Sequence, residues 1–468
     1  MANAVATKDD LWGHPKGLYV LFFTELWERF SYYGMRAILV LYMISAVNDD
    51  NPGFGWDKTD AISLYGSYTA LVYILSILGG WVADKFWGQK KTVLIGGILL
   101  CLGHGVLAID ALWAFYLGLG LIILGVGGLK PNISTMVGGL YKSGDDRRDK
   151  GFTIFYIGIN IGAFLSALIV GGVAEIYGWH YGFGLAGIGM VLGQVVFMWG
   201  NKYLEGIGEA TKDLSPAEAE AKKKPLTPVE VDRMKVMGIS FLLIIVFWGA
   251  FEQAGGLMNI YTAEKTDLSL SFSIPFIGAA IPASWFQSVN AFFIITLGVP
   301  IAGFWYNWKK KGKESSSIFK MATGVIIMGW GFLFMSAASM QFETEGSSAM
   351  YWLVLAYLFH TVGELCASPV ALSFITKLAP LKYASIMMGA YFAATGVGNK
   401  VAGWVGEYSQ SAGELEIFTG IAIFCTIIGL LVIALLKPLK RLTHGAEDTQ
   451  QGSHNEEAEG FELADKPA

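Results

Sequence analysis

The sequence has few charged residues and almost no cysteine for its length. Of its 468 residues, 15% are charged, 54% are hydrophobic and three are cysteines. A water-soluble protein of this size needs a far more polar surface, so the composition excludes that class and predicts an integral membrane protein. The three cysteines, Cys101, Cys366 and Cys425, lie in apolar segments without CxxC or CxxH spacing. That placement excludes a disulfide framework and a cysteine-based metal site.

Signatures of catalysis and of nucleotide binding are also missing. We find no nucleophile–base triad, no Walker motif and no cluster of metal ligands. A membrane-embedded enzyme would need such a set at the bilayer boundary, so we expect no enzyme activity. We also expect no cofactor, and an ion gradient rather than a nucleotide as the energy source.

Apolar runs of about 20 residues recur along most of the chain, which is the length of a helix that crosses a bilayer. Breaks at charged, proline-rich and glycine-rich stretches separate twelve such runs. We therefore predict an all-α membrane protein with twelve transmembrane helices, near residues 18–45, 61–84, 92–109, 112–139, 151–174, 181–201, 236–262, 284–307, 318–340, 350–377, 383–407 and 416–436.

A single long polar stretch divides these helices into six and six. It predicts an N-terminal six-helix bundle over residues 1–202, a linker over 203–235 and a C-terminal six-helix bundle over 236–441. We find no apolar run within the linker. Residues 442–468 are acidic and lack apolar periodicity, so we expect a disordered tail.

Lysine and arginine gather on one side of the predicted membrane, in the linker and in the loops on its side. The loops on the other side hold only Lys58 and Lys265. The positive-inside rule then places the linker, both termini and the tail in the cytoplasm. We predict a multi-pass protein of the cell inner (plasma) membrane.

Eight charged residues fall within the predicted helices, where each costs at least a few kcal/mol if it faces lipid. They come from both halves of the chain: Glu25, Glu28, Arg29, Arg36, Lys130, Glu252, Glu364 and Lys400. Isolated ion pairs that tie helices together would explain one or two of them. So many, spread over both halves, favour one polar pathway at the centre of the membrane.

The first helix carries a polar stripe about three turns long. Its members recur at steps of three and four residues: Glu25, Glu28, Arg29, Tyr32, Tyr33 and Arg36. Two carboxylates beside an arginine can share one proton, because a like charge favours protonation and a cation opposes it. A nearby Lys130 could compete for the same carboxylates. Such a unit is suited to coupling protonation to movement.

These residues also carry a resemblance to a known family. Residues 25–34 resemble the ExxERFxYYG motif of the proton-dependent oligopeptide transporters, a branch of the major facilitator superfamily. Residues 155–162 are similar to the family's FYxxINxG signature, and residues 79–88 to its loop between helices 2 and 3. Residues 285–290 and 363–369 also fit. The resemblance runs from about residue 14 to 441 and implies the major facilitator fold.

The resemblance implies roles for particular residues. Glu25, Glu28 and Arg29 look like a proton-coupling cluster, and we assign Lys130 and Glu252 to proton coupling with them. A gating ion pair on the outer face is implied for Lys58 and Glu264. Glu252 resembles a carboxylate that pairs with the arginine of helix 1, here Arg36.

The same resemblance implies a pocket for a small peptide. Arg36 and Lys130 look like the cations that receive its carboxylate, and Glu364, helped by Ser368, like the acceptor of its amino group. The remaining members are Tyr32, Tyr33 and Tyr73 in the lining, Asn160 and Asn290 toward the peptide backbone, and Tyr391, at a position where some bacterial relatives have tryptophan.

We therefore expect a proton-coupled symporter that imports di- and tripeptides by alternating access. A related carrier of nitrate or of a drug-like molecule is the first alternative, although a nitrate carrier has no use for Glu364. A sensor or scaffold of the same fold is the second. The expected partners are small peptides, protons and the lipid bilayer, with no nucleic acid, and the expected functional unit is a monomer.

Overall fold

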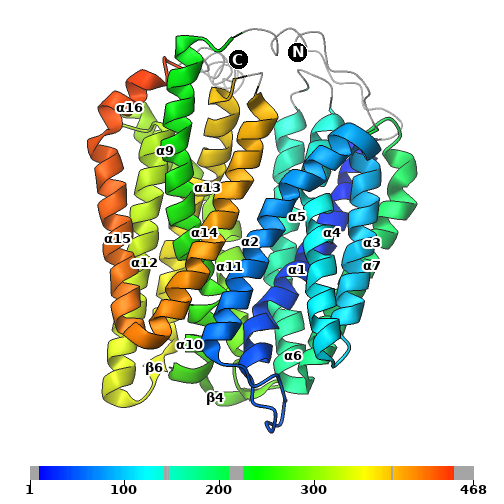
Figure 1. Cartoon of the computed structure of the whole chain (residues 1–468), viewed down its shortest axis with the longest axis vertical. Coiled ribbons are helices and arrows are strands. Elements are labelled where there is room, and N and C mark those ends of the chain that lie inside the picture. Colours follow the sequence, from blue (N-terminus) through cyan, green and yellow to red (C-terminus); the bar gives the residue numbers. More distant parts are fainter. Residues whose placement is uncertain (1–9, 142–144, 146, 210–224, 381–382, 447–468) are drawn as a thin grey trace, which may run out of the picture.

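The chain forms two bundles of long helices that stand side by side and lean toward each other (Figure 1). The computed structural model describes residues 10–141, 145, 147–209, 225–380 and 383–446. The middle of the predicted linker, 210–224, and the predicted tail from residue 447 onward lie outside the described residues. The first half of the chain forms one bundle and the second half forms the other.

The first bundle contains six spans, two of which continue through π-helical turns. Its elements are α1 (Lys16–Ile44), α2 (Lys58–Val82), η1 (Ala83–Trp87), α3 (Gly88–Leu107), α4 (Leu112–Gly139), α5 (Arg147–Ser166), η2 (Ala167–Gly171), α6 (Gly172–Tyr177), α7 (Trp179–Trp199) and η3 (Gly200–Tyr203). The segments α5, η2 and α6 together make one span.

The second bundle has the same number of spans. Its helices are α9 (Pro228–Phe251), η4 (Glu252–Ala254), α10 (Leu257–Lys265), η5 (Ala283–Phe286), α11 (Gln287–Lys310), α12 (Ser317–Glu345), α13 (Met350–Leu378), α14 (Ala384–Ala412), α15 (Glu414–Ala434) and the short α16 (Leu436–Leu442). The segments α9, η4 and α10 form one interrupted span.

Within the described residues, nine segments are long and apolar enough to cross a membrane. One of them, Lys58–Leu107, contains both α2 and α3. The remaining helices of that length are α1, which carries the charged stripe, and α14, each 29 residues long. Counted this way, the helices agree with the predicted twelve spans.

The seventh span begins earlier than the predicted residue 236. Helix α9 starts at Pro228, because Thr227 and Glu230 form a capping box and proline suits the first helical position. Residues 228–235, which the sequence assigns to the linker, are therefore helical.

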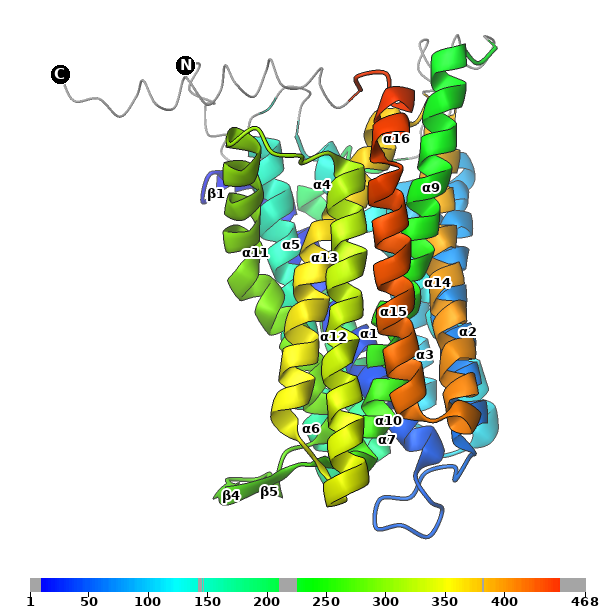
Figure 2. The ribbon, with the colours of Figure 1, turned by 90° about the vertical axis from the view of Figure 1, so that its left-hand side faces the viewer.

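Short strands lie at both ends of the bundles (Figure 2). Strands β4 (Ser269–Ile274) and β5 (Gly278–Ala280) form an antiparallel hairpin at one end, which we call the hairpin end. Strands β3 (Thr266–Asp267) and β6 (Ser348–Ala349) pair in parallel, and β1 (Asp10–Leu11) and β2 (His14–Pro15) pair antiparallel. Helix α16, β1 and the start of α9 lie at the opposite end, which we call the linker end.

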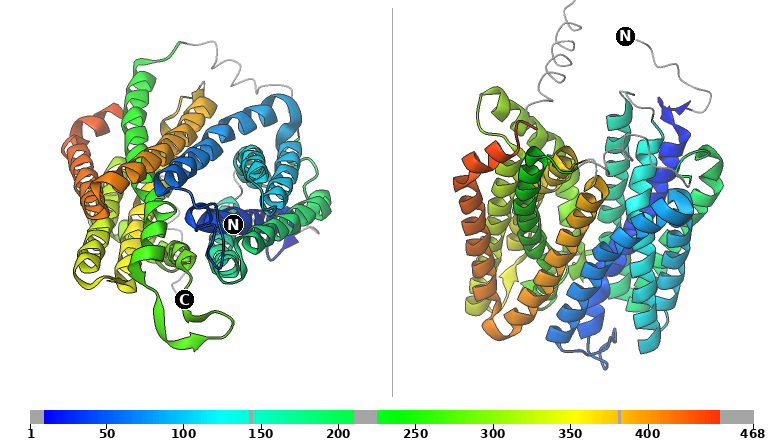
Figure 3. Two further views of the ribbon diagram at one scale, coloured as in Figure 1. Left: turned by 60° about the horizontal axis from the view of Figure 1, so that its bottom comes forward. Right: turned by 45° about the horizontal axis from the view of Figure 1, so that its top comes forward.

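Two pairs of helices make the most extensive contacts between the bundles: α2 packs against α14, and α5 against α11. The first pair is the more extensive, and it crosses closely at two glycines. A Cβ built on Gly66 would lie 2.7 Å from the Cα atom of Gly403, so a larger residue there would push the helices apart. Two tilted views show the helices of the first half gathered on one side and those of the second half on the other (Figure 3). Their inner faces enclose the candidate site.

Candidate functional site

A cavity lies between the two bundles and contains about 910 Å³ of space that no atom fills, open solvent included. Both halves of the chain contribute to its wall: Tyr33, Arg36, Tyr73, Tyr156, Ile159, Asn160, Ala163, Ser166, Ala167, Trp248, Phe251, Glu252, Ala254, Gln287, Asn290, Ala291, Ile294, Tyr357 and Glu364.

An ion pair crosses this cavity where the seventh span is interrupted. Arg36 Nη1 of α1 lies 3.0 Å from Glu252 Oε1, and both side chains are buried. Tyr65 of α2 donates a hydrogen bond of 3.3 Å to the other carboxylate oxygen. Glu252 opens the 3-10 turn η4, and Gly255 and Gly256 follow it. A broken helix of this kind lets an acidic side chain and free backbone groups face a cavity.

The polar stripe of α1 forms a compact buried cluster at its centre. Arg29 Nε donates a hydrogen bond of 2.7 Å to Glu25 Oε1 and lies 3.0 Å from Glu28 Oε2. All three side chains are at most 4% exposed. The periodicity of the sequence predicts this contact, since residues three and four apart meet on one helix face. None of the three lines the cavity itself.

Lys130 of α4 approaches the cavity behind an aromatic ring. Its ammonium nitrogen lies 3.7 Å from the ring centre of Tyr73, which lines the cavity. Such a cation–π contact stabilises a desolvated ammonium only in part. Among the described residues Lys130 forms no ion pair with a carboxylate, so its charge is available to a ligand or to the α1 cluster.

Glu364 of α13 is, besides Glu252, the other acid that the second bundle contributes to the cavity wall. Asn290 of α11 donates a hydrogen bond of 2.9 Å to Glu364 Oε2 and another of 3.0 Å to Thr361 Oγ1. Asn290 therefore lines the cavity and also positions the carboxylate of Glu364. Within the part of the chain that the structure describes, no lysine or arginine pairs with Glu364.

Asn160 of α5 lies in the opposite wall and donates a hydrogen bond of 2.9 Å to the backbone carbonyl oxygen of Tyr156, one turn earlier. The ring of Tyr33 lies between the two arginines of α1, 5.2 Å from Arg36 and 5.9 Å from Arg29. One aromatic side chain thus connects the buried cluster to the cavity wall.

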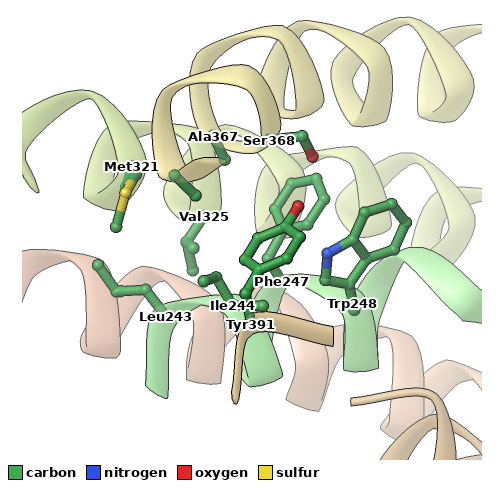
Figure 4. Close-up of a pocket in the computed structure, with 10 residues that line it drawn as sticks. Leu243, Ile244, Phe247, Trp248, Met321, Val325, Ala367, Ser368 and Tyr391 are labelled. Atoms are coloured by element: carbon green, nitrogen blue, oxygen red, sulfur yellow. The ribbon is translucent and has the colours of Figure 1, made fainter. Parts of the chain in front are cut away.

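A smaller apolar recess of about 260 Å³ lies within the second bundle (Figure 4). Trp248, Ser368 and Tyr391 lie on one side of it, and Leu243 and Met321 on the other. Trp248 also lines the large cavity, so the two spaces share a wall. The structure places Ser368 and Tyr391 in this recess, and the roles implied for them toward a bound peptide stay predictions.

At the hairpin end, Lys58 of α2 and Glu264 of α10 join the two bundles with an Nζ–Oε2 distance of 2.5 Å. The structure thus brings together the two residues for which the resemblance implies a gate. Lys265, the other base of this side, pairs with Glu414 at the start of α15. Both bases that the sequence places in these loops are therefore neutralised by carboxylates.

The structure gathers seven of the predicted residues in the cavity wall: Tyr33, Arg36, Tyr73, Asn160, Glu252, Asn290 and Glu364. Tyr32 is only 1% exposed and packs against Tyr33 behind that wall. Sequence reasoning did not find Tyr156, Trp248, Phe251, Gln287 and Tyr357 as lining residues. Tyr156 is part of the stretch 155–162 and lies one turn from Asn160, which is a signal that could have identified it.

Two bundles around a charged central cavity define this protein as a secondary carrier of the major facilitator fold. The chain belongs to the POT family: that family's model matches residues 90–217 and 217–414. Its members are transporters and not enzymes. No group of three or more histidine, cysteine, aspartate or glutamate residues suited to a metal occurs among the described residues.

The chain is similar to characterised transporters over nearly its whole length. It is 35% identical to the di-/tripeptide transporter of Lactococcus lactis subsp. cremoris, over 94% of this chain and 99% of the relative. It is 33% identical to the peptide transporter YePEPT of Yersinia enterocolitica subsp. palearctica, over 94% of this chain and 97% of the relative.

Solved structures agree in fold. A crystal structure of the peptide transporter POT in complex with sulfate is 35% identical and superposes with a TM-score of 0.85, over 92% of this chain and 96% of that chain. A POT family transporter in complex with 5-aminolevulinic acid is 30% identical, with a TM-score of 0.83 over 92% of this chain and 98% of that chain.

Proposed function

We propose that this protein is a proton-coupled symporter that imports di- and tripeptides by alternating access. One observation carries the proposal. A single cavity has Glu364, free of any cation among the described residues, on its second-bundle side. Arg36 and Tyr73, whose ring contacts Lys130, lie on its first-bundle side. A zwitterionic peptide carries an ammonium at one end and a carboxylate at the other. Its two ends match these charges, and the bound peptide bridges the bundles.

The coupling of transport to protons is assigned to the cluster of Glu25, Glu28 and Arg29, together with Lys130 and the Arg36–Glu252 pair. A single arginine faces two carboxylates in this cluster. Protonation of one carboxylate leaves the arginine to the other, and the change in charge reaches the cavity through the ring of Tyr33. Binding of substrate and of protons would in this way favour the same rearrangement of the bundles.

Contacts at the hairpin end support an outward-closed state for this structure. Lys58 and Glu264 bridge the bundles there. Asn259 of α10 donates a hydrogen bond of 2.8 Å to the backbone carbonyl oxygen of Ala37 in α1. In the alternating-access step, such contacts are released while the linker end closes. The pair of Lys58 and Glu264 acts as the gate of this step.

The wider setting follows from the same function. The hairpin end faces the outside, both termini face the cytoplasm, and the protein is a multi-pass protein of the inner (plasma) membrane. The chain divides into bundles at 1–202 and 236–441, joined by the linker 203–235, with the tail 442–468. It works as a monomer, without a cofactor, and the proton gradient supplies the energy.

Uptake of labelled dialanine into proteoliposomes tests this function. We expect accumulation above protein-free vesicles when the outside is more acidic than the inside, and its loss when a protonophore removes the gradient. Labelled nitrate, offered to the same vesicles, tests the anion-carrier alternative. Dialanine uptake no greater than in protein-free vesicles would overturn the proposal.

A further inference from the structure

A carboxylate of the first bundle caps the start of a helix in the second. Glu175, in α6 near the hairpin end, accepts a hydrogen bond of 2.9 Å from the backbone N–H of Ala283 and one of 2.8 Å from that of Ser284. These N–H groups open η5 and the long helix α11, and the N-cap residue Pro282 provides no side-chain hydrogen bond to them. The first N–H groups of a helix need an acceptor, and an anion suits them best.

The segments η2 and η5 approach each other closely around this contact. A Cβ built on Gly171 of η2 would lie 2.2 Å from Ser284 Oγ and 2.8 Å from Ser284 Cβ, so a larger residue there would push η5 away. Ser284 is fully buried, and Ala283 is 2% exposed. No ion pair of Glu175 with a lysine, arginine or histidine occurs in the described part of the chain. The two amide groups of the other bundle are therefore its partners.

Two further hydrogen bonds join α5 and η2 of the first bundle to η5 and α11 of the second, an interface that we call the seam. Trp285 Nε1 donates to the backbone carbonyl oxygen of Leu168 at 2.9 Å, and Ser288 Oγ donates to that of Phe164 at 2.8 Å. Both carbonyl groups lie in or just before the π-helical turn η2, where the regular helical hydrogen bonds are shifted. The seam between α5 and α11 is thus joined by directional bonds, with Glu175 at its hairpin end.

We propose that Glu175 is a second gate residue of the outer face, which holds α6 to the start of α11 while that face is closed. The bridge between Lys58 and Glu264 closes the seam between α2 and α10, and Glu175 closes the seam on the α5–α11 side. This inference rests on the alternating-access part of the proposed function, since the Glu175 bonds must break when the bundles separate outside. It does not depend on which substrate is carried.

The test measures distances between spin labels at both ends of the molecule. Tyr181→Cys and Glu345→Cys report the hairpin end, and Lys202→Cys with Lys313→Cys report the linker end. Each pair joins one bundle to the other, in a background without the three native cysteines. Glu175→Gln removes the charge and one acceptor oxygen.

Ala283→Pro removes one donor and leaves the carboxylate in place. Proline fits there because Ala283 is the first residue of η5 and Pro282 is already extended, with ψ at 134°. Glu343→Gln is the matched control, an exposed acid at the hairpin end of α12 within one bundle.

We expect Glu175→Gln and Ala283→Pro each to raise the ratio of outward-open to outward-closed molecules by about tenfold, the effect of losing one charge-assisted hydrogen bond. The distance at the hairpin end lengthens while that at the linker end shortens, and Glu343→Gln leaves both unchanged. Unchanged distances in the two seam variants would overturn the gate role of Glu175, whatever dialanine uptake shows. Broader distance distributions at both ends, without a change from outward-closed to outward-open, would also overturn it, because they would indicate a general loss of packing.

Discussion

Arg36 and Glu252 are 216 residues apart in the sequence, yet their charged groups lie 3.0 Å apart across the central cavity. Arg36 belongs to a continuous helix of the first bundle, and Glu252 to the interruption in the seventh span. The pair is thus a direct electrostatic link between two bundles that must move relative to each other. Its strength limits how far the cavity can open without another partner for each charge.

We expect Glu252→Gln to destabilise the protein, because it leaves the buried charge of Arg36 without its partner. Breaking a buried ion pair on one side costs about 3–5 kcal/mol. The double variant Arg36→Gln, Glu252→Gln should unfold at a higher temperature than Glu252→Gln alone, since it buries no lone charge. Thermal unfolding in detergent measures both, and a double variant no more stable than the single one would contradict this account of the pair.

Glu364→Gln should weaken the binding of dialanine by about tenfold or more, because a charge-assisted hydrogen bond to the peptide ammonium is lost. N-acetyl-dialanine has no ammonium group, so its binding should change far less. Thr361→Val serves as the control, since it removes the other acceptor of Asn290 and leaves the carboxylate in place. Competition against labelled dialanine measures binding of both peptides to the two variants and to the unchanged protein. An equal loss for both peptides would refute the assigned partner.

Glu25→Gln and Glu28→Gln should each abolish proton-driven uptake, because either change fixes the charge of the cluster around Arg29. Counterflow, in which unlabelled peptide inside exchanges with labelled peptide outside, should survive, since it needs no net proton movement. The two assays on the same vesicles separate coupling from binding. Undiminished concentrative uptake in both variants would remove the cluster from the coupling mechanism.

The pH profile of uptake should not depend on Glu314, in the loop between α11 and α12. Burial alone would raise the pKa of Glu314, but hydrogen bonds from Lys440 and Ser316 outweigh it and lower the pKa to about 2. A carboxylate with a lowered pKa contributes to stability above its ordinary pKa of about 4.3, and loses that contribution as the pH falls toward 2. Glu314 therefore stays charged between roughly pH 5 and 8. Glu314→Gln should leave the pH optimum of uptake unchanged, and a shifted optimum would show that groups at the linker end take part in coupling.

The sequence predicts the fold well, because a bilayer imposes one length on every span. Apolar runs and charged loops identify the twelve helices, and the steps of three and four along α1 predict the contact among Glu25, Glu28 and Arg29. The start of α9 at Pro228 could also have been predicted, since Thr227 and Glu230 have the spacing of a capping box.

The site is predicted less completely, because its residues meet across large sequence distances. Nothing in the residues themselves pairs Lys58 with Glu264, or Arg36 with Glu252, and only the family resemblance suggested these pairs. It did not suggest Tyr357, which lies outside the matching stretches and lines the cavity through the position of its helix. Glu175 binds the backbone N–H groups of residues 283 and 284, so the side chains at these two positions do not predict the contact. The break after Glu252 does have a signal in the sequence, the pair Gly255-Gly256.

A structure of the protein with bound dialanine tests the central claim most directly, which is that one cavity receives both ends of a peptide from opposite bundles. We predict the peptide ammonium within hydrogen-bonding distance of Glu364 and the carboxylate turned toward Arg36 and Lys130. A peptide bound in the reverse orientation, or held by one bundle alone, would contradict the account.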